Sequence, residues 1–137
     1  MIDVIIADDQ EVFRTGMAEV LGAEDDIRIA GKPESLKQLL NILPTISPHI
    51  LILSRGFLPA FSKSRRMWKR HQSALLVLTE ENDPIAYVRL LGVQGILYRS
   101  MEGSDMVDMV RRVARVVPLA QNLSSDHATT SSNQSVG

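Results

Sequence analysis

Five short apolar segments alternate with longer intervals along this chain. The segments are Val4–Ala7, Ile27–Ala30, Ile50–Leu53, Leu75–Leu78 and Ile96–Tyr98. Each has the length of a β-strand, and most are bounded by turn or polar residues. Four of the five are nearly continuous rather than alternating, which is typical of strands that helices cover on both faces. The pattern therefore predicts a parallel sheet between two layers of helices.

The intervals between these segments are long enough for helices, and several show helical spacing. One stripe consists of Val12, Phe13, Met17, Val20 and Leu21, and a second of Leu36, Leu39, Leu40 and Leu43. Asn82-Asp83-Pro84 offers a cap and a start for a fourth helix. Strand and helix alternate five times, and right-handed crossovers then predict a doubly wound, flavodoxin-like α/β fold. Its expected strand order is 2-1-3-4-5, with helices on both faces.

The last expected helix, residues 103–117, has a broad apolar stripe. Its members are Met106, Val107, Met109, Val110, Val113, Ala114, Val116 and Val117. The stripe is wider than packing on one sheet requires. Two interpretations stay open with equal weight: a surface for a second copy or another protein, and deeper burial against the chain's own sheet.

The composition of the 137 residues fits one domain and a tail. The apolar fraction of 45% is ordinary for a globular protein. After Pro118 the chain becomes rich in Ser, Thr and Asn, so we expect a domain over residues 1–118 and a disordered tail or linker over 119–137. The absence of cysteine excludes disulfides and thiolate catalysis. With no basic leader and no apolar run of membrane-spanning length, we expect a soluble, cytoplasmic protein.

The net charge is −1, but the charges are distributed unevenly. No acidic residue occurs between Glu34 and Glu80, and that interval holds Lys37, Arg55, Lys63, Arg65, Arg66, Lys69 and Arg70. A basic helix can attract nucleic acid or an acidic protein. A solvated helix face is the favoured interpretation, because Trp68 alone is not a stacking platform for bases. We therefore expect no direct binding of nucleic acid.

Folds of this class place their functional site at the carboxyl ends of the strands. That rule selects Asp8 and Asp9 after the first strand, Ser54 after the third, Thr79 after the fourth and Arg99 after the fifth. Adjacent aspartates at a strand end can hold Mg²⁺ through oxygen ligands, although such a pair serves as a loop or helix cap about as often. The site is expected to join two carboxylates, two hydroxyls and a cation.

Five segments match the motifs of one known family in order and spacing. They are Ile5–Gln10, Val12–Met17, Pro48–Ser54, Leu76–Thr79 and Gly92–Arg99. Together they resemble the receiver domain of bacterial two-component response regulators, in the subfamily that usually carries a LuxR-type helix-turn-helix. The resemblance covers residues 2–117. It implies a phosphoacceptor at the end of the third strand, a switch hydroxyl after the fourth, and a DNA-binding domain elsewhere in a longer protein.

The chain departs from the family pattern at several of its functional positions. The resemblance aligns Ser54 with the phosphoacceptor aspartate, Arg99 with the lysine and Ile96 with the aromatic switch residue. Tyr98 would share a strand face with Ile96. The proline after the third strand, Pro59, comes one residue late and the following stretch is short, so a truncated or irregular third helix is expected.

These departures predict a site whose carboxylates are neutralised by an arginine of the same chain. Loss of one carboxylate leaves Asp8 and Asp9 facing Arg99, with Arg55 as a second possible cation. A guanidinium can bind a carboxylate through a bidentate fork, so we expect no cofactor and at most weak, vestigial Mg²⁺ binding by Asp8 and Asp9.

The leading hypothesis is a phosphorylation-independent receiver module without enzymatic activity. It would act in signal transduction and transcription regulation through a homodimer or another protein partner. One alternative is a phosphorelay receiver that is phosphorylated on Ser54 or a nearby acidic residue. A serine hydroxyl, unlike a carboxylate, needs a base to become nucleophilic. The other alternative is a pseudo-receiver that senses a small molecule in the vacated pocket.

Overall fold

The computed structural model describes residues 1–64, 73–84 and 92–129, with side chains in the last helix described as far as Val116. The strands are β1 (Ile2–Ala7), β2 (Ile27–Gly31), β3 (Ile50–Ser54), β4 (Ala74–Thr79) and β5 (Gly95–Tyr98). The helices are α1 (Glu11–Gly22), α2 (Leu36–Ile42), the four-residue α3 (Leu58–Phe61) and α6 (Gly103–Thr129). Two 3₁₀ turns, Arg55–Phe57 and Ser62–Ser64, flank α3.

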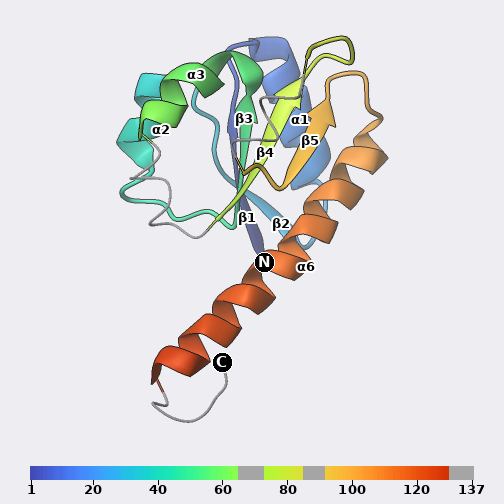
Figure 1. The fold of residues 1–137 in the computed structure, drawn as a ribbon. Coiled ribbons are helices and arrows are strands. Elements are labelled where there is room, and N and C mark those ends of the chain that lie inside the picture. Colours follow the sequence, from blue (N-terminus) through green and yellow to red (C-terminus); the bar gives the residue numbers. More distant parts are fainter. Residues whose placement is uncertain (65–72, 85–91, 130–137) are drawn as a thin grey trace.

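The five strands form one parallel sheet in the order β2-β1-β3-β4-β5, so the predicted topology is confirmed (Figure 1). The helices α1 and α6 lie on one face of the sheet, and α2 and α3 lie on the other (Figure 1). All five residues of β3 and all six of β4 are buried, because helices cover both of their faces. The strand ends after β1, β3, β4 and β5 therefore meet at one edge of a rigid core.

Two hydrophobic clusters fill the space between the sheet and its helices. On one face Val4 and Ile6 of β1 pack with Leu21 of α1 and Val110 of α6. On the other face Ile5 and Ala7 pack with residues of α2 and α3. Side chains along β1 alternate between the two clusters, as the period of a strand requires.

The helix α6 is fastened to the loop before β2 by a charged cluster. Arg111 lies 2.9 Å from Asp26 through Nε and 2.7 Å from Glu24 through Nη2. The pKa of the Asp26 carboxyl is lowered, first by its hydrogen bond from Arg111.

Most of the broad apolar stripe on α6 serves the chain's own core. Met106, Val107, Val110, Val113 and Ala114 are all buried against the sheet, and Met109 is half-buried. Val116 is the exception, with 66% of its surface exposed. Burial against the sheet therefore accounts for all but a small part of the described stripe.

The end of the last helix differs from the expectation. We expected it near Val117, but α6 passes through Pro118 and ends at Thr129 (Figure 1). The sequence after the proline contains Leu119, Ala120, Gln121 and Leu123, which have good helix propensity. The prediction of the helix end was wrong, whereas the division into residues 1–118 and 119–137 stays a prediction.

Two further expectations fall partly outside the described residues. The short α3 with its flanking 3₁₀ turns agrees with a truncated or irregular third helix as far as Ser64. Arg65, Arg66, Lys69 and Arg70 lie outside the described residues, as does the expected fourth helix after Pro84.

Candidate functional site

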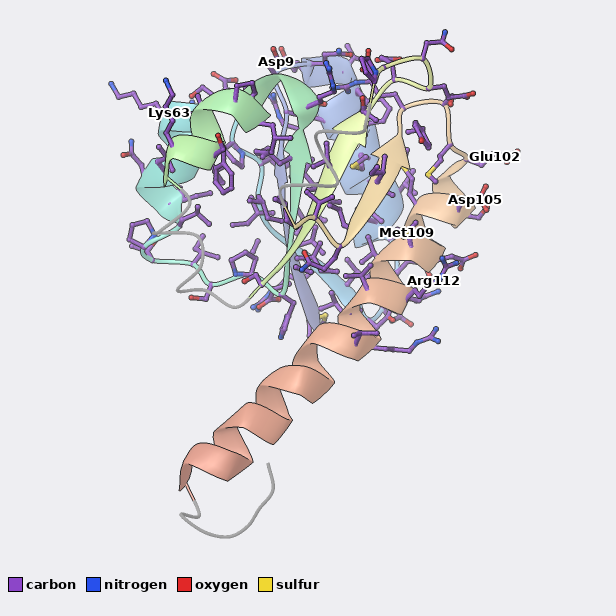
Figure 2. All side chains as sticks on the ribbon, in the orientation of Figure 1. Asp9, Lys63, Glu102, Asp105, Met109 and Arg112 are labelled. Atoms are coloured by element: carbon purple, nitrogen blue, oxygen red, sulfur yellow. The ribbon has the colours of Figure 1, made fainter. Side chains whose placement is uncertain are left out.

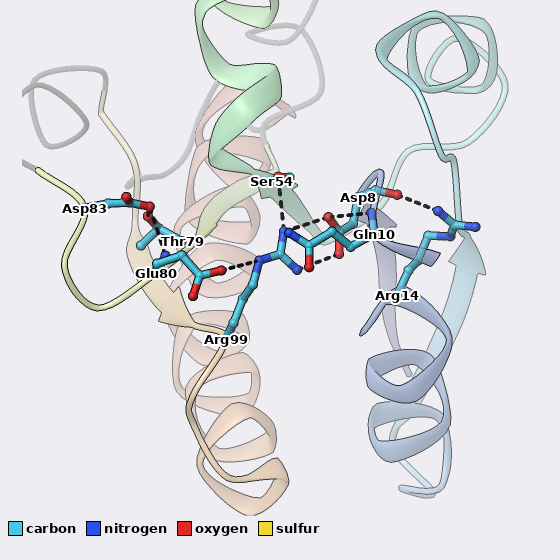
Figure 3. Close-up of polar contacts among 8 residues, drawn as sticks. All are labelled: Asp8, Gln10, Arg14, Ser54, Thr79, Glu80, Asp83 and Arg99. Atoms are coloured by element: carbon cyan, nitrogen blue, oxygen red, sulfur yellow. Dashed lines mark hydrogen bonds and ion pairs between the residues drawn. The ribbon is translucent and has the colours of Figure 1, made fainter. Parts of the chain in front are cut away.

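The centre of the site is an ion pair between β1 and the residue that follows β5. Arg99 donates from Nη1 to Asp8 Oδ2 at 2.9 Å and from Nη2 to Asp8 Oδ1 at 2.8 Å (Figure 3). The Asp8 side chain is fully buried, and 10% of the Arg99 side chain is exposed. The predicted bidentate fork is therefore present, and both oxygens of the Asp8 carboxylate are occupied by one guanidinium.

Three further groups surround the same guanidinium. Arg99 Nη2 donates to Ser54 Oγ at 3.4 Å, and Arg99 Nε lies 3.2 Å from Glu80 Oε2 (Figure 3). The carbon at the centre of the guanidinium lies 4.8 Å from the centroid of the Phe13 ring, within the range of a cation–π contact. The pKa of Arg99 is raised, above all by the hydrogen bonds to Asp8, and also by the charges of Asp8, Glu80 and Asp9.

Arg14 of α1 holds the backbone at Asp8 in place. Arg14, which is buried, donates from Nη1 to the Asp8 carbonyl at 2.6 Å, and its Nη2 lies 3.6 Å from Glu34. Asp8 Oδ1 also accepts from the backbone N–H of Gln10 at 3.3 Å. The position of the Asp8 carboxylate is thus fixed by both side-chain and main-chain contacts.

Asp9 does not join this pair. Its side chain is exposed (Figure 2), and its influence on Arg99 is through its charge. Successive residues at a strand end project in opposite directions, so a buried Asp8 leaves Asp9 toward solvent. The expectation that both aspartates face Arg99 in one pocket was therefore wrong in part.

Thr79, at the end of β4, is 2% exposed, and its hydroxyl contacts Asp83 rather than Arg99. Its hydroxyl donates to Asp83 Oδ2 at 2.7 Å (Figure 3). The same carboxylate oxygen accepts from the Glu80 N–H at 3.1 Å. The pKa of Asp83 is lowered, chiefly by the hydrogen bond from Thr79.

Ile96 and Tyr98 lie on β5, which ends directly before Arg99. Both are half-buried and both line a cavity of about 460 Å³ between β5 and α6. The shared strand face that we expected is therefore present. The residue at the aromatic switch position of the sequence is Ile96, which has no aromatic ring.

The arrangement does not fit Mg²⁺. A magnesium ion needs several free oxygen ligands in octahedral geometry, but both Asp8 oxygens face Arg99 and the third carboxylate position is Ser54. Within the described residues, no group of three or more His, Cys, Asp or Glu side chains is placed to hold a metal ion. The cation of this site is supplied by the chain itself.

Sequence reasoning brought Asp8, Ser54 and Arg99 together correctly but missed four other residues that contact them or Thr79. Glu80 directly follows Thr79, so the strand-end rule that selected Thr79 extends naturally to it. Phe13, Arg14 and Asp83 approach through the packing of α1 and the conformation of a loop. No pattern in the sequence marks those contacts.

The chain is similar in sequence or fold to several known proteins. The chain is 26% identical over 119 residues to the response regulator GacA of Pseudomonas protegens, covering 82% of this chain and 55% of GacA. It is 30% identical over 128 residues to the DNA-binding transcriptional activator DevR/DosR of Mycobacterium tuberculosis, covering 89% of this chain and 58% of that protein. The signal receiver domain of the response regulator NarL from M. tuberculosis superposes with a TM-score of 0.73 at 20% identity, covering 84% of this chain and 97% of that one.

The chain is a receiver domain of the response-regulator type. No family model matches the sequence. The receiver domain described here spans just over half the length of the two curated relatives. In the described part of this receiver domain, no helix is long and apolar enough to cross a membrane.

Proposed function

We propose that this receiver domain acts in two-component signalling without being phosphorylated itself. The observation that carries the proposal is the bidentate pair between Arg99 and Asp8. In the family, the acidic pair and the acceptor aspartate hold Mg²⁺ for phosphoryl transfer. Here Arg99 faces the buried carboxylate of Asp8, and a serine stands at the acceptor position.

The chemistry of Ser54 supports the same proposal. Ser54 is 5% exposed, and its hydroxyl oxygen lies 3.4 Å from Nη2 of the cationic Arg99. A serine needs a general base, and a guanidinium cannot accept a proton. The Asp8 carboxylate, which shares Arg99 with Ser54, has both oxygens engaged by that guanidinium, which disfavours Asp8 as a base for Ser54.

We propose that the output is binding rather than catalysis, so the domain is not an enzyme. A population shift requires a partner with different affinity for two conformations. The partner in this proposal is a second copy or another signalling protein. A helix-turn-helix in a longer parent protein would contact DNA, since the curated relatives extend well beyond the matched segment. The expected cytoplasmic location stays a prediction.

Small-molecule sensing in the vacated pocket has less support. The described residues line cavities of about 420, 460 and 520 Å³, and none of these is lined by Asp8, Ser54 or Arg99. The Arg99 side chain extends between Asp8 and Ser54 at the strand ends (Figure 3).

Intact mass spectrometry tests the proposal. The wild-type chain is incubated with a small-molecule phosphodonor and Mg²⁺, and Ser54→Ala serves as the matched control. We expect the mass of the wild-type chain to stay unchanged. A stoichiometric gain of one phosphoryl group that is lost in Ser54→Ala would contradict the proposal.

A further inference from the structure

The loop after β4, residues 80–84, is fastened at both ends by its own carboxylates. At one end Asp83 accepts hydrogen bonds from the Thr79 hydroxyl and the Glu80 N–H, at 2.7 and 3.1 Å. At the other end Glu80 lies 3.2 Å from Arg99 Nε. Figure 3 shows these contacts as one continuous chain of interactions that leads from Asp83 to Asp8.

A second set of contacts joins the same loop to the segment after β5. The backbone N–H of Arg99 donates to the Thr79 carbonyl at 2.9 Å. The Ser100 hydroxyl donates to the carboxylate of Glu81. The loop after β4 and the segment after β5 are therefore connected by main-chain and side-chain contacts together.

The Thr79 hydroxyl has a single proton to donate, and it is committed to Asp83. The acceptor is a carboxylate, and such charge-assisted hydrogen bonds are roughly twice as strong as neutral ones. Thr79 is 2% exposed, and Asp83 is half-buried. Turning the hydroxyl toward Ser54 would break the bond and leave the Asp83 oxygen with the Glu80 N–H alone.

We propose that Asp83 and Glu80 are positioning residues that hold the loop after β4 in one conformation. Asp83 holds the Thr79 hydroxyl, and Glu80 holds the loop against the Arg99 side chain. This inference rests on the proposed function and deepens it, because it names the residues that stop the switch hydroxyl from responding. In this proposal the acceptor position is disabled because it is a serine, and the switch hydroxyl is disabled because Asp83 holds it.

The rotamer of Thr79 tests the role of Asp83. Threonine methyl groups are labelled with ¹³C, and the Thr79 signal is assigned from its loss in Thr79→Val. The three-bond couplings from the methyl carbon to the backbone nitrogen and carbonyl carbon report the χ1 angle. We expect values for one rotamer in the wild-type chain and rotamer-averaged values in Asp83→Ala. Asp108→Ala, which removes an exposed aspartate on α6, should leave the couplings unchanged.

The Nε–H of Arg99 tests the role of Glu80. We expect its exchange with solvent to accelerate by more than tenfold in Glu80→Ala, and to stay unchanged in the control Glu102→Ala. The proposal is overturned by averaged Thr79 couplings in the wild-type chain, by one-rotamer couplings in Asp83→Ala, or by unchanged Arg99 exchange in Glu80→Ala.

Both measurements are made without a phosphodonor, so they separate this inference from the proposed function. Phosphoryl uptake by the wild-type chain would contradict the proposed function, whatever the Thr79 couplings are. Averaged couplings in a chain that takes up no phosphoryl group would overturn the loop inference alone.

Discussion

The Arg99 guanidinium binds both carboxylate oxygens of Asp8, at 2.8 and 2.9 Å, in a buried position at the ends of the strands. The two residues are 91 positions apart in the sequence, and the sheet order places β1 and β5 on either side of β3 and β4. The ion pair therefore joins the carboxyl end of β1 to the residue after β5, and the positive charge that faces Asp8 comes from Arg99.

Removing Arg99 should destabilise the domain strongly. In Arg99→Ala the fully buried Asp8 carboxylate loses the guanidinium that binds both of its oxygens, and loss of one member of a buried pair costs about 3–5 kcal/mol. Urea denaturation followed by circular dichroism measures the change. The matched control is Arg28→Ala, because Arg28 binds Asp3 through two contacts of 2.8 Å but is mostly exposed. Equal losses in the two variants would contradict the assigned role of burial.

Magnesium binding should be weak or absent. Because Arg99 occupies both Asp8 oxygens, a metal ion would have to displace a guanidinium from a buried carboxylate. Calorimetric titration with millimolar MgCl₂ should show no saturable binding to the wild-type chain. Tight saturable binding would mean that the Arg99–Asp8 ion pair separates easily, which would contradict the role given to its two hydrogen bonds.

The hydrogen bonds to Asp83 predict a dependence of stability on pH. The pKa of Asp83 is lower in the folded chain than its ordinary value of about 4, so the unfolded chain takes up the proton first as the pH falls. The contribution of Asp83 is thus complete above the ordinary value and is lost as the pH falls through the lowered folded value. The unfolding free energies of wild type and Asp83→Asn should differ at neutral pH and converge in acid. A difference that is constant across this range would contradict the lowered pKa.

The space around two glycines, one in β5 and one in α1, predicts opposite effects when each is replaced by alanine. A Cβ on Gly95 would lie 2.9 Å from Leu76 Cδ2, and Leu76 is fully buried, so Gly95→Ala should destabilise by roughly 1–3 kcal/mol. A Cβ on Gly16, inside α1, would meet nothing within 4 Å. Gly16→Ala should therefore stabilise by about 0.5–1 kcal/mol. Denaturation midpoints of the two variants measure both changes, and a neutral or stabilising Gly95→Ala would contradict the packing.

The fold was predictable because its signals are local and mutually consistent. The continuous apolar runs of β3 and β4 allow few arrangements other than a buried parallel sheet. The Asp8–Arg99 pair was predictable because strand-end positions meet at one edge and opposite charges there pair. The contacts of Phe13 and Asp83 were not, because they depend on how α1 and a short loop pack. The end of α6 was also missed, because a proline interrupts the pattern without ending the helix.

In the proposed function, Arg99 and the Thr79–Asp83 contact, not Ser54 alone, keep this receiver domain from using a phosphoryl group. The most direct test is the intact mass of Ser54→Asp after incubation with a phosphodonor and Mg²⁺. We predict no phosphoryl gain, because Arg99 still occupies Asp8 and Thr79 still donates to Asp83. A stoichiometric gain of one phosphoryl group in this single variant would contradict the claim.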